Sequence, residues 1–249
     1  MGFQVDNCIA NKTINGKQCT IISHVDDLKI SHVDRNIVED FINKLNERFR
    51  QESPLVTSHG KVLEYLGISI EYTTRGKVKI SMYKYIKKML DELPLDMSGI
   101  SITPAALHLF NTDDSAEILC EEKAQLFHHL VAKLLYLSCR SRQVIQMAVA
   151  FLCTRLQRPD VGDYKKLACK MKYLCGTKDL TLTIKPSDGP RWWVDSSYSV
   201  HPDMRSHSGI YMTLGKGITN TTSRKQKLNT KSFTEAELVA IDNSMGQVL

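Results

Sequence analysis

Residues 20 to 34 read TIISHVDDLKISHVD, which places two adjacent aspartates, Asp26 and Asp27, between two short apolar runs. The runs around Ile21-Ile22 and Leu28–Ile30 have β character, so the segment predicts two strands joined at the aspartates. Adjacent carboxylates repel each other and are costly to remove from water, so a buried pair would need a positive partner. The alternative is an ordinary hairpin turn, in which aspartate is common. The motif alone leaves both interpretations open.

Periodicity and capping residues predict the elements around this hairpin. Asp34 can cap a helix with one apolar face, formed by Ile37, Phe41, Leu45 and Phe49. The stretch 62–82 contains two alternating β-rich runs on either side of Thr74-Arg75-Gly76, a hairpin signal. Residues 1–82 therefore predict the order β-α-β-β.

After residue 82, the spacing of apolar residues predicts mainly helices. An apolar face is formed by Ile86, Met89, Leu90 and Leu93, and Pro94 ends the run. Residues 95–119 are loop-like, and three further helices are predicted at 121–139, 144–157 and 163–176. We expect Gly176 to close the last of them. Together these helices would form a small helical layer.

A Pro/Gly/Ser stretch, KPSDGP at 185–190, has the composition of a linker. Beyond it, WWVDSSYS, GIYMTLG and GITNTTSRK predict strands. The final segment predicts a helix that Ser232 or Thr234 caps, and its pattern has no C-terminal signal, so we expect it to continue in a longer parent protein. The fold class is therefore α+β, with regions at 1–82, 83–185 and 186–249.

Composition limits the classes of function. The 249 residues are 42% hydrophobic and 24% charged, with a net charge of +6 and no apolar run long enough for a membrane helix. The seven cysteines form no C-x-x-C pair or zinc spacing, which indicates reduced thiols in an intracellular protein. Lysines gather at 83–88, 165–178 and 223–231, which favours a polyanionic partner, although such clusters are usually solvated helix faces.

A second carboxylate pair is suggested near the C-terminus. Asp195 follows the apolar Trp192-Trp193-Val194, where no turn explains it, and Glu237 lies 42 residues later on the predicted helix. A strand carboxylate that faces a helix carboxylate can bind a divalent cation, because Mg²⁺ prefers hard oxygen ligands. Taken singly, each residue is better explained as an exposed surface charge, Asp195 on an edge strand and Glu237 on a helix.

An ordered set of motifs carries a family resemblance over nearly the whole chain. In order, they are HVDDLKI, YLGISI, YKYIKKML, HHLVAKLLYLSCRSRQVIQMAVAFL, KYLCGTKDLTL, WWVDSSYS and TSRKQKLNTKSFTEAELVAI. The chain resembles the reverse transcriptase–ribonuclease H region of copia-type long-terminal-repeat retrotransposon polyproteins. The resemblance implies the C-terminal half of a polymerase palm at 1–82, a helical thumb and connection at 83–185, and the start of a ribonuclease H-like sheet at 186–249.

The resemblance also implies site residues and a cofactor. Asp26 matches a direct ligand of Mg²⁺ or Mn²⁺ and Asp27 a supporting charge, while Asp195 and Glu237 match two carboxylates of the ribonuclease H site. Glu235 is not chosen, because the family's ligand stands directly before Leu. The YLGISI motif is similar to a strand that holds the primer terminus.

Expected partners are an RNA template, a DNA primer, an RNA–DNA hybrid and the rest of the Pol polyprotein, in the cytoplasm or nucleus and without a membrane. Expected nucleic-acid contacts are His24 (in place of the family's tyrosine), Tyr65, Gly67, Lys84, Lys87, Lys88, Lys225 and Lys227.

The resemblance implies that each catalytic site is incomplete in this chain. The family's third polymerase aspartate is expected upstream of the first residues, and the remaining ribonuclease H carboxylates beyond Leu249. We therefore expect a reverse transcriptase/ribonuclease H fragment that is not catalytic alone. The alternatives are a non-catalytic nucleic-acid-binding remnant and a degenerate reading frame without function.

Overall fold

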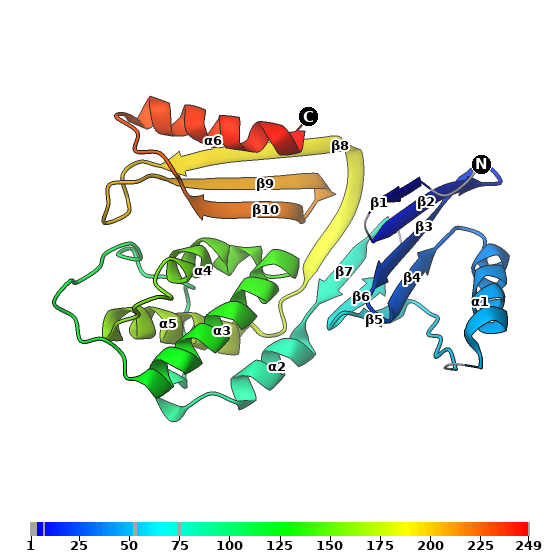
Figure 1. Cartoon of the computed structure of the whole chain (residues 1–249), viewed down its shortest axis with the longest axis horizontal. Coiled ribbons are helices and arrows are strands. Elements are labelled where there is room, and N and C mark those ends of the chain that lie inside the picture. Colours follow the sequence, from blue (N-terminus) through cyan, green and yellow to red (C-terminus); the bar gives the residue numbers. More distant parts are fainter. Residues whose placement is uncertain (1–3, 7, 52–53, 74–75, 249) are drawn as a thin grey trace. The chain divides into compact units, whose positions relative to one another are not determined.

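The computed structural model describes residues 4–6, 8–51, 54–73 and 76–248, and it divides the chain into two units, Met1–Leu66 and Gly67–Leu249. Each unit is described by itself (Figure 1). Both combine helices with antiparallel strands, so the predicted α+β class is confirmed. The predicted three-region division is not tested by this arrangement and stays a prediction.

The Met1–Leu66 unit is built on a four-stranded antiparallel sheet of order β1-β2-β3-β4. Its elements are β1 (Gln4–Asp6), β2 (Ile9–Ile14), β3 (Lys17–His24), β4 (Asp27–Ser31), helix α1 (Arg35–Phe49) and β5 (Val62–Tyr65). Asp34 caps α1 as predicted, because its carboxylate accepts a hydrogen bond from the Asn36 N–H at 2.9 Å. The predicted hairpin and helix are therefore confirmed.

The strands before the hairpin were missed by the sequence interpretation. A two-residue turn, Asn15-Gly16, joins β2 to β3, with φ angles of +50° and +72°. Asn-Gly is the preferred pair for a turn that needs positive φ at both positions. The sequence signal for this extra hairpin was present.

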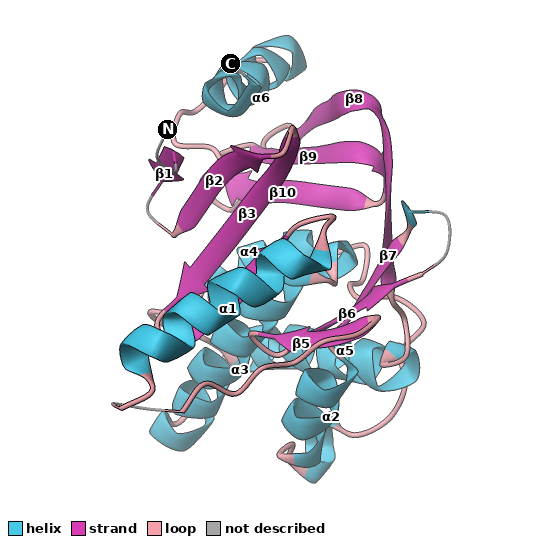
Figure 2. Cartoon of the chain, turned by 90° about the vertical axis from the view of Figure 1, so that its right-hand side faces the viewer, coloured by secondary structure: helices cyan, strands magenta, loops and turns pink. Residues whose placement is uncertain are grey.

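The Gly67–Leu249 unit contains a sheet whose strands lie in the order β10-β9-β8-β7-β6. They are β6 (Ile68–Tyr72), β7 (Val78–Ser81), β8 (Leu182–Ser197), β9 (His207–Lys216) and β10 (Ile218–Lys225). The predicted hairpin at 74–76 is confirmed by pairing of Tyr72 with Val78, although Thr74 and Arg75 lie outside the described residues. Figure 2 shows β8 as one long curved strand that runs from β7 to β9.

Helices of this unit supply its main core. They are α2 (Tyr83–Asp91), α3 (Glu121–Arg140), α4 (Gln146–Cys153), α5 (Val161–Thr177) and α6 (Phe233–Val248), with short 3-10 turns η2 (Leu95–Met97) and η3 (Gln143–Ile145). The predicted face of α2 is confirmed, because Ile86 and Met89 are buried in the same hydrophobic cluster as Phe127 and Leu134 of α3. Helix α6 lies along one face of β8–β10, and α4 lies on the other face (Figure 1).

Two local expectations were wrong. The KPSDGP stretch is not a linker: it lies within β8, where the register with β9 shifts between Pro186 and Arg191. Such an irregularity accommodates Pro and Gly in a strand. Gly176 does not close α5, which continues to Thr177. A Cβ at Gly176 would lie 2.8 Å from Ile100 Cγ2, so close packing explains this glycine.

Of the two candidate caps for α6, the structure selects Ser232. The Glu235 N–H donates to Ser232 Oγ at 3.2 Å, and the Glu235 carboxylate accepts from the Lys231 N–H at 2.6 Å. These reciprocal bonds resemble a capping box and fix the start of the helix that carries Glu237. None of the described helices is both long and apolar enough to cross a membrane.

Candidate metal sites and nucleic-acid surface

The Asp26-Asp27 hairpin lies in the Met1–Leu66 unit. His24 pairs with Asp27, so Val25 and Asp26 form the two-residue loop, and Asp27 is the first residue of β4. Both carboxylates and the His24 ring are exposed. The predicted placement at a hairpin tip is confirmed, and no burial forces the two charges together.

Val25 gives this turn an unusual backbone. It has a φ of +51°, and its side chain is 89% exposed, so no packing of the valine itself explains the conformation. A β-branched residue at positive φ costs on the order of 1–3 kcal/mol, and such conformations gather at functional sites. The backbone at Val25, next to Asp26, therefore lowers the stability of the turn.

Tyr65, at the end of β5, lies close enough to the hairpin for electrostatic interaction. Burial raises the pKa of its phenol, and the charges of Asp27 and Cys8 raise it further. Its buried hydroxyl has no hydrogen-bond partner among the described residues. An unpaired buried hydroxyl costs stability, so a ligand that bonded to it would recover this cost. The structure thus associates Tyr65 with Asp27, two residues that we selected separately.

The YLGISI motif is not a single strand, which corrects that expectation. Leu66 and Gly67 have φ angles of +52° and +73° and form a turn between β5, which ends at Tyr65, and β6, which begins at Ile68. Gly67 is therefore a turn residue, and positive φ explains why glycine is favoured there.

The second carboxylate pair is assembled in the Gly67–Leu249 unit. Asp195 lies near the end of β8 and Glu237 lies in the second turn of α6. Both accept a hydrogen bond from the Ser196 N–H, Asp195 Oδ1 at 2.9 Å and Glu237 Oε1 at 3.2 Å. The two carboxylates therefore lie side by side, as predicted. Glu235 does not join them, because its carboxylate caps the start of α6.

The pair is more enclosed than the hairpin. Glu237 is partly buried, whereas Asp195 is exposed. Two carboxylates held beside one N–H repel each other, and a cation would offset that repulsion. Among the described residues, no group of three or more His, Cys, Asp or Glu side chains could hold a metal ion. Each candidate site is therefore a pair of carboxylates.

The lysines selected from the sequence fall in two places. Lys84, Lys87 and Lys88 are exposed residues of α2. Lys225 is partly buried and forms an ion pair with Asp203 at 2.6 Å, while Lys227 is exposed in the loop after β10. By exposure, Lys87, Lys88 and Lys227 are better placed than Lys225 to contact a phosphate.

An aromatic and cationic stack on α2 and α3 was missed. The Arg140 guanidinium lies 3.7 Å from the centroid of the Tyr136 ring, and that ring lies 5.4 Å from the ring of Tyr85. Arg140 follows Tyr136 by four residues on α3, a spacing that places both on one helix face. The four-residue spacing of Tyr136 and Arg140 can be read from the sequence YLSCR. The sequence alone does not show that Tyr85, on another helix, lies beside them.

Comparison with known proteins supports the resemblance. The chain is 26% identical over 244 residues to the retrovirus-related Pol polyprotein from transposon TNT 1-94 of Nicotiana tabacum. The aligned region covers 94% of this chain and 18% of that protein. It is also 26% identical over 243 residues to the truncated transposon Ty1-A Gag-Pol polyprotein of Saccharomyces cerevisiae, covering 92% of this chain and 20% of that one. The chain is homologous to copia-type retrotransposon Pol polyproteins.

The match covers only part of the length of these two polyproteins. The chain spans about a fifth of each of these two polyproteins. An uncharacterized mitochondrial protein of Arabidopsis thaliana is 26% identical over 225 residues, and there the match covers 89% of both chains. No family model matches the chain, and no solved structure matches it.

Proposed function

We propose that the chain is a reverse transcriptase–ribonuclease H segment of a copia-type Pol polyprotein and carries part of each catalytic site. In the parent, Asp26 and Asp27 serve RNA-directed DNA synthesis, a nucleotidyl transfer, and Asp195 and Glu237 serve cleavage of RNA in a hybrid. The observation that carries the proposal is the convergence of Asp195 and Glu237, from 42 residues apart, on the Ser196 N–H. The order of the motifs along the sequence predicts that these two carboxylates lie close together.

The residues present fit Mg²⁺ or Mn²⁺ in part. Carboxylate oxygens are the ligands such cations prefer, and each pair supplies two carboxylates. Mg²⁺ takes six ligands, so either pair leaves most positions to water or to residues outside the described set. A cation bound there supplies charge that stabilises phosphoryl transfer. The pairs on their own hold it weakly, and the proposed chain is not catalytic alone.

The nucleic-acid surface of the proposal combines the α2 lysines with the Arg140–Tyr136–Tyr85 stack, all in one unit. Lysine contacts to phosphate are independent of sequence, and aromatic rings and arginine stack on bases or sugars. The partners are the RNA template, the DNA primer and their hybrid, which places the chain in the cytoplasm or nucleus. The remaining parts of the polyprotein complete the sites.

The direct test is activity, measured by extension of a labelled primer on RNA and by cleavage of an RNA–DNA hybrid, with Mg²⁺ or Mn²⁺. We expect neither activity from the chain alone. Within a longer polypeptide that supplies the remaining carboxylates, Asp26→Asn with Asp27→Asn should abolish extension and spare cleavage, and Asp195→Asn should do the reverse. Extension by the chain alone that vanishes in the Asp26→Asn, Asp27→Asn variant would overturn the claim that it is incomplete.

The second candidate function is nucleic-acid binding without chemistry, favoured by the exposed lysines of α2. The affinity for a hybrid should then fall with salt, with a log–log slope of about −0.9 per phosphate neutralised on duplex DNA. Replacing Lys84, Lys87 and Lys88 by Gln should flatten that slope. An affinity that is equal at low and moderate salt would contradict this function.

A further inference from the structure

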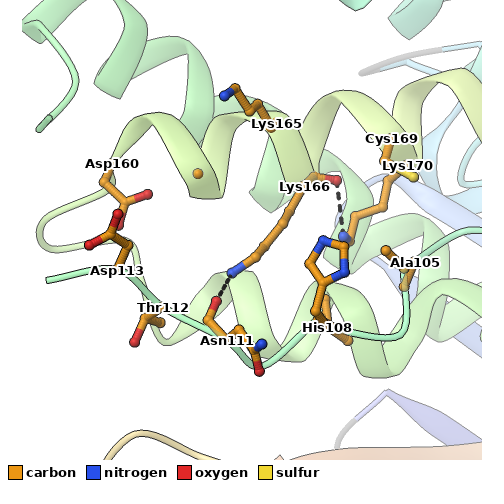
Figure 3. Close-up of a pocket in the computed structure, with 13 residues that line it drawn as sticks. Ala105, His108, Asn111, Thr112, Asp113, Asp160, Lys165, Lys166, Cys169 and Lys170 are labelled. Atoms are coloured by element: carbon orange, nitrogen blue, oxygen red, sulfur yellow. Dashed lines mark hydrogen bonds between the residues drawn. The ribbon is translucent and has the colours of Figure 1, made fainter. Parts of the chain in front are cut away.

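A cavity of about 380 Å³ lies between the first half of α5 and the loop at 105–113, within the Gly67–Leu249 unit. Figure 3 shows Lys166 and Lys170 reaching from α5 toward this loop, with His108 beside Lys170. Asp113 and Asp160 line the other end of the cavity. None of these residues belongs to the carboxylate pairs or to the lysines of α2.

Lys170 is the unusual member of the lining. Its side chain is 0% exposed, and its ammonium donates to the Lys166 carbonyl at 3.0 Å. That carbonyl is the one acceptor recorded for it among the described residues, although an ammonium has three N–H groups. No described carboxylate forms an ion pair with it, and burial lowers its pKa to about 8. A buried ammonium without a counter-ion is costly.

Three other charged side chains around the cavity already have hydrogen-bond partners. Lys166 donates to the Asn111 carbonyl at 2.5 Å, and burial lowers its pKa. Asp160 accepts from Arg155 at 2.9 Å and from the Asp163 N–H at 2.8 Å. Asp113 accepts from the Ser115 hydroxyl and N–H. Lys165 also lines the cavity, but its side chain is exposed to solvent. Lys170 is therefore the one buried charged side chain of the described lining that has no oppositely charged group within ion-pair distance.

We propose that this cavity binds the phosphate group of a small molecule. The buried ammonium of Lys170 donates to the phosphate, and Lys166 lies beside it. A phosphate oxygen would accept the remaining N–H groups of Lys170, and charge-assisted bonds of this kind are the strong ones. The volume lies in the lower range of small-molecule sites, so it admits a phosphate monoester with a small organic part. This inference is independent of the proposed polymerase and nuclease roles.

The experiment titrates the whole chain, in phosphate-free buffer at pH 7, with inorganic phosphate in one arm and ribose 5-phosphate in the other. Binding is followed by calorimetry and by the lysine Nζ–H signals of the ¹⁵N-labelled protein. We expect saturable binding that shifts the Lys170 signal. Tighter binding of ribose 5-phosphate would identify a monoester site, and equal affinity would identify a site for the phosphate group alone.

Two variants decide whether Lys170 carries the binding. Lys170→Met should weaken the affinity at least tenfold, while Lys172→Met, which removes the same charge from α5 outside the cavity, should change it less than twofold. Lys166→Met gives a second variant of the site, in case Lys170→Met does not fold. Absence of saturable binding by the unaltered chain, or equal weakening in Lys172→Met, would overturn the proposal.

Discussion

The two carboxylate pairs are brought together in different ways. Asp26 and Asp27 are neighbours in sequence, and one hairpin turn is enough to present them. Asp195 and Glu237 are brought together by β8 and α6, whose positions depend on the sheet and helices of the Gly67–Leu249 unit. A local site tolerates loss of distant packing, whereas a site assembled by tertiary structure does not. A substitution in the core of one unit should therefore affect the two pairs differently.

The largest effect is expected from the helical core of the unit that carries the second pair. Leu134 of α3 is 0% exposed, so Leu134→Ala should lower the free energy of unfolding of the Gly67–Leu249 unit by about 2–5 kcal/mol. Both tryptophans, Trp192 and Trp193, lie in this unit, so their fluorescence in a denaturant titration reports its unfolding.

The adjacent Leu135 provides a matched control, because its side chain is 42% exposed. Leu135→Ala should cost less than about 1 kcal/mol. Hydrogen exchange at the Asp26-Asp27 hairpin should be the same in both variants. An equal loss of protection at the hairpin and at Ser196 in Leu134→Ala would show that the two sites do not depend on separate packing.

Acid should also weaken the second pair's unit selectively. His201 and His207 are buried, with ring nitrogens 3.0 Å apart, and His207 also contacts Ser223 Oγ at 2.7 Å. Burial lowers the pKa of each imidazole to about 4; Lys225 further lowers that of His201, and His201 further lowers that of His207. The unfolded chain, with a histidine pKa of about 6.5, therefore binds more protons between these values.

Stability of the Gly67–Leu249 unit should consequently be complete above about pH 6.5 and fall as the pH falls toward 4. The loss by pH 5 should be at most about 2 kcal/mol per histidine. Denaturant titrations followed by tryptophan fluorescence at pH 7 and 5 measure it. His207→Gln should reduce the pH dependence, and an unchanged dependence in that variant would assign the acid response to other groups.

A smaller effect is expected at the start of α6. Ser232→Ala removes the cap and should cost about 1 kcal/mol, since the first turn leads into the turn that carries Glu237. Thr234→Ala is the control, because Thr234 is not the cap. Amide exchange of residues 235–238 should accelerate in Ser232→Ala alone, and exchange at β3 and β4 should not respond. Equal acceleration in both variants would contradict the cap assignment.

The smallest effect is expected at the hairpin turn. Glycine adopts a positive φ without strain, so Val25→Gly should stabilise the turn by up to about 1 kcal/mol. Val33→Gly, at an exposed valine without positive φ, should destabilise the unit by a similar amount. Exchange of the Ser23 and Leu28 amides measures both. Destabilisation by Val25→Gly would mean that the turn is not strained.

The same contrast explains which features could be predicted from the sequence. Local signals sufficed for the Asp26-Asp27 hairpin and for the cap at Asp34, because adjacent residues determine both. KPSDGP and Gly176 were misread because their roles depend on strand β9 and on Ile100, which lie far away in sequence. The Lys170 cavity was missed for the same reason: a lysine cluster at 165–178 looks solvated until the loop at 105–113 covers it.

Cation sharing between Asp195 and Glu237 is the most direct test of the central claim that strand and helix form one site. Mn²⁺ broadening of the Ser196 amide signal gives the affinity in the unaltered chain, in Asp195→Asn, in Glu237→Gln and in the double variant, with Asp242→Asn as the control on the same helix. If both carboxylates hold one cation, either single variant should weaken binding at least fivefold and the double variant should add little. Broadening near Asp26 should not change in any of them. The account would be contradicted if the loss of affinity in the double variant equalled the product of the losses in the two single variants. A Ser196 signal that Mn²⁺ does not affect would also contradict a shared site.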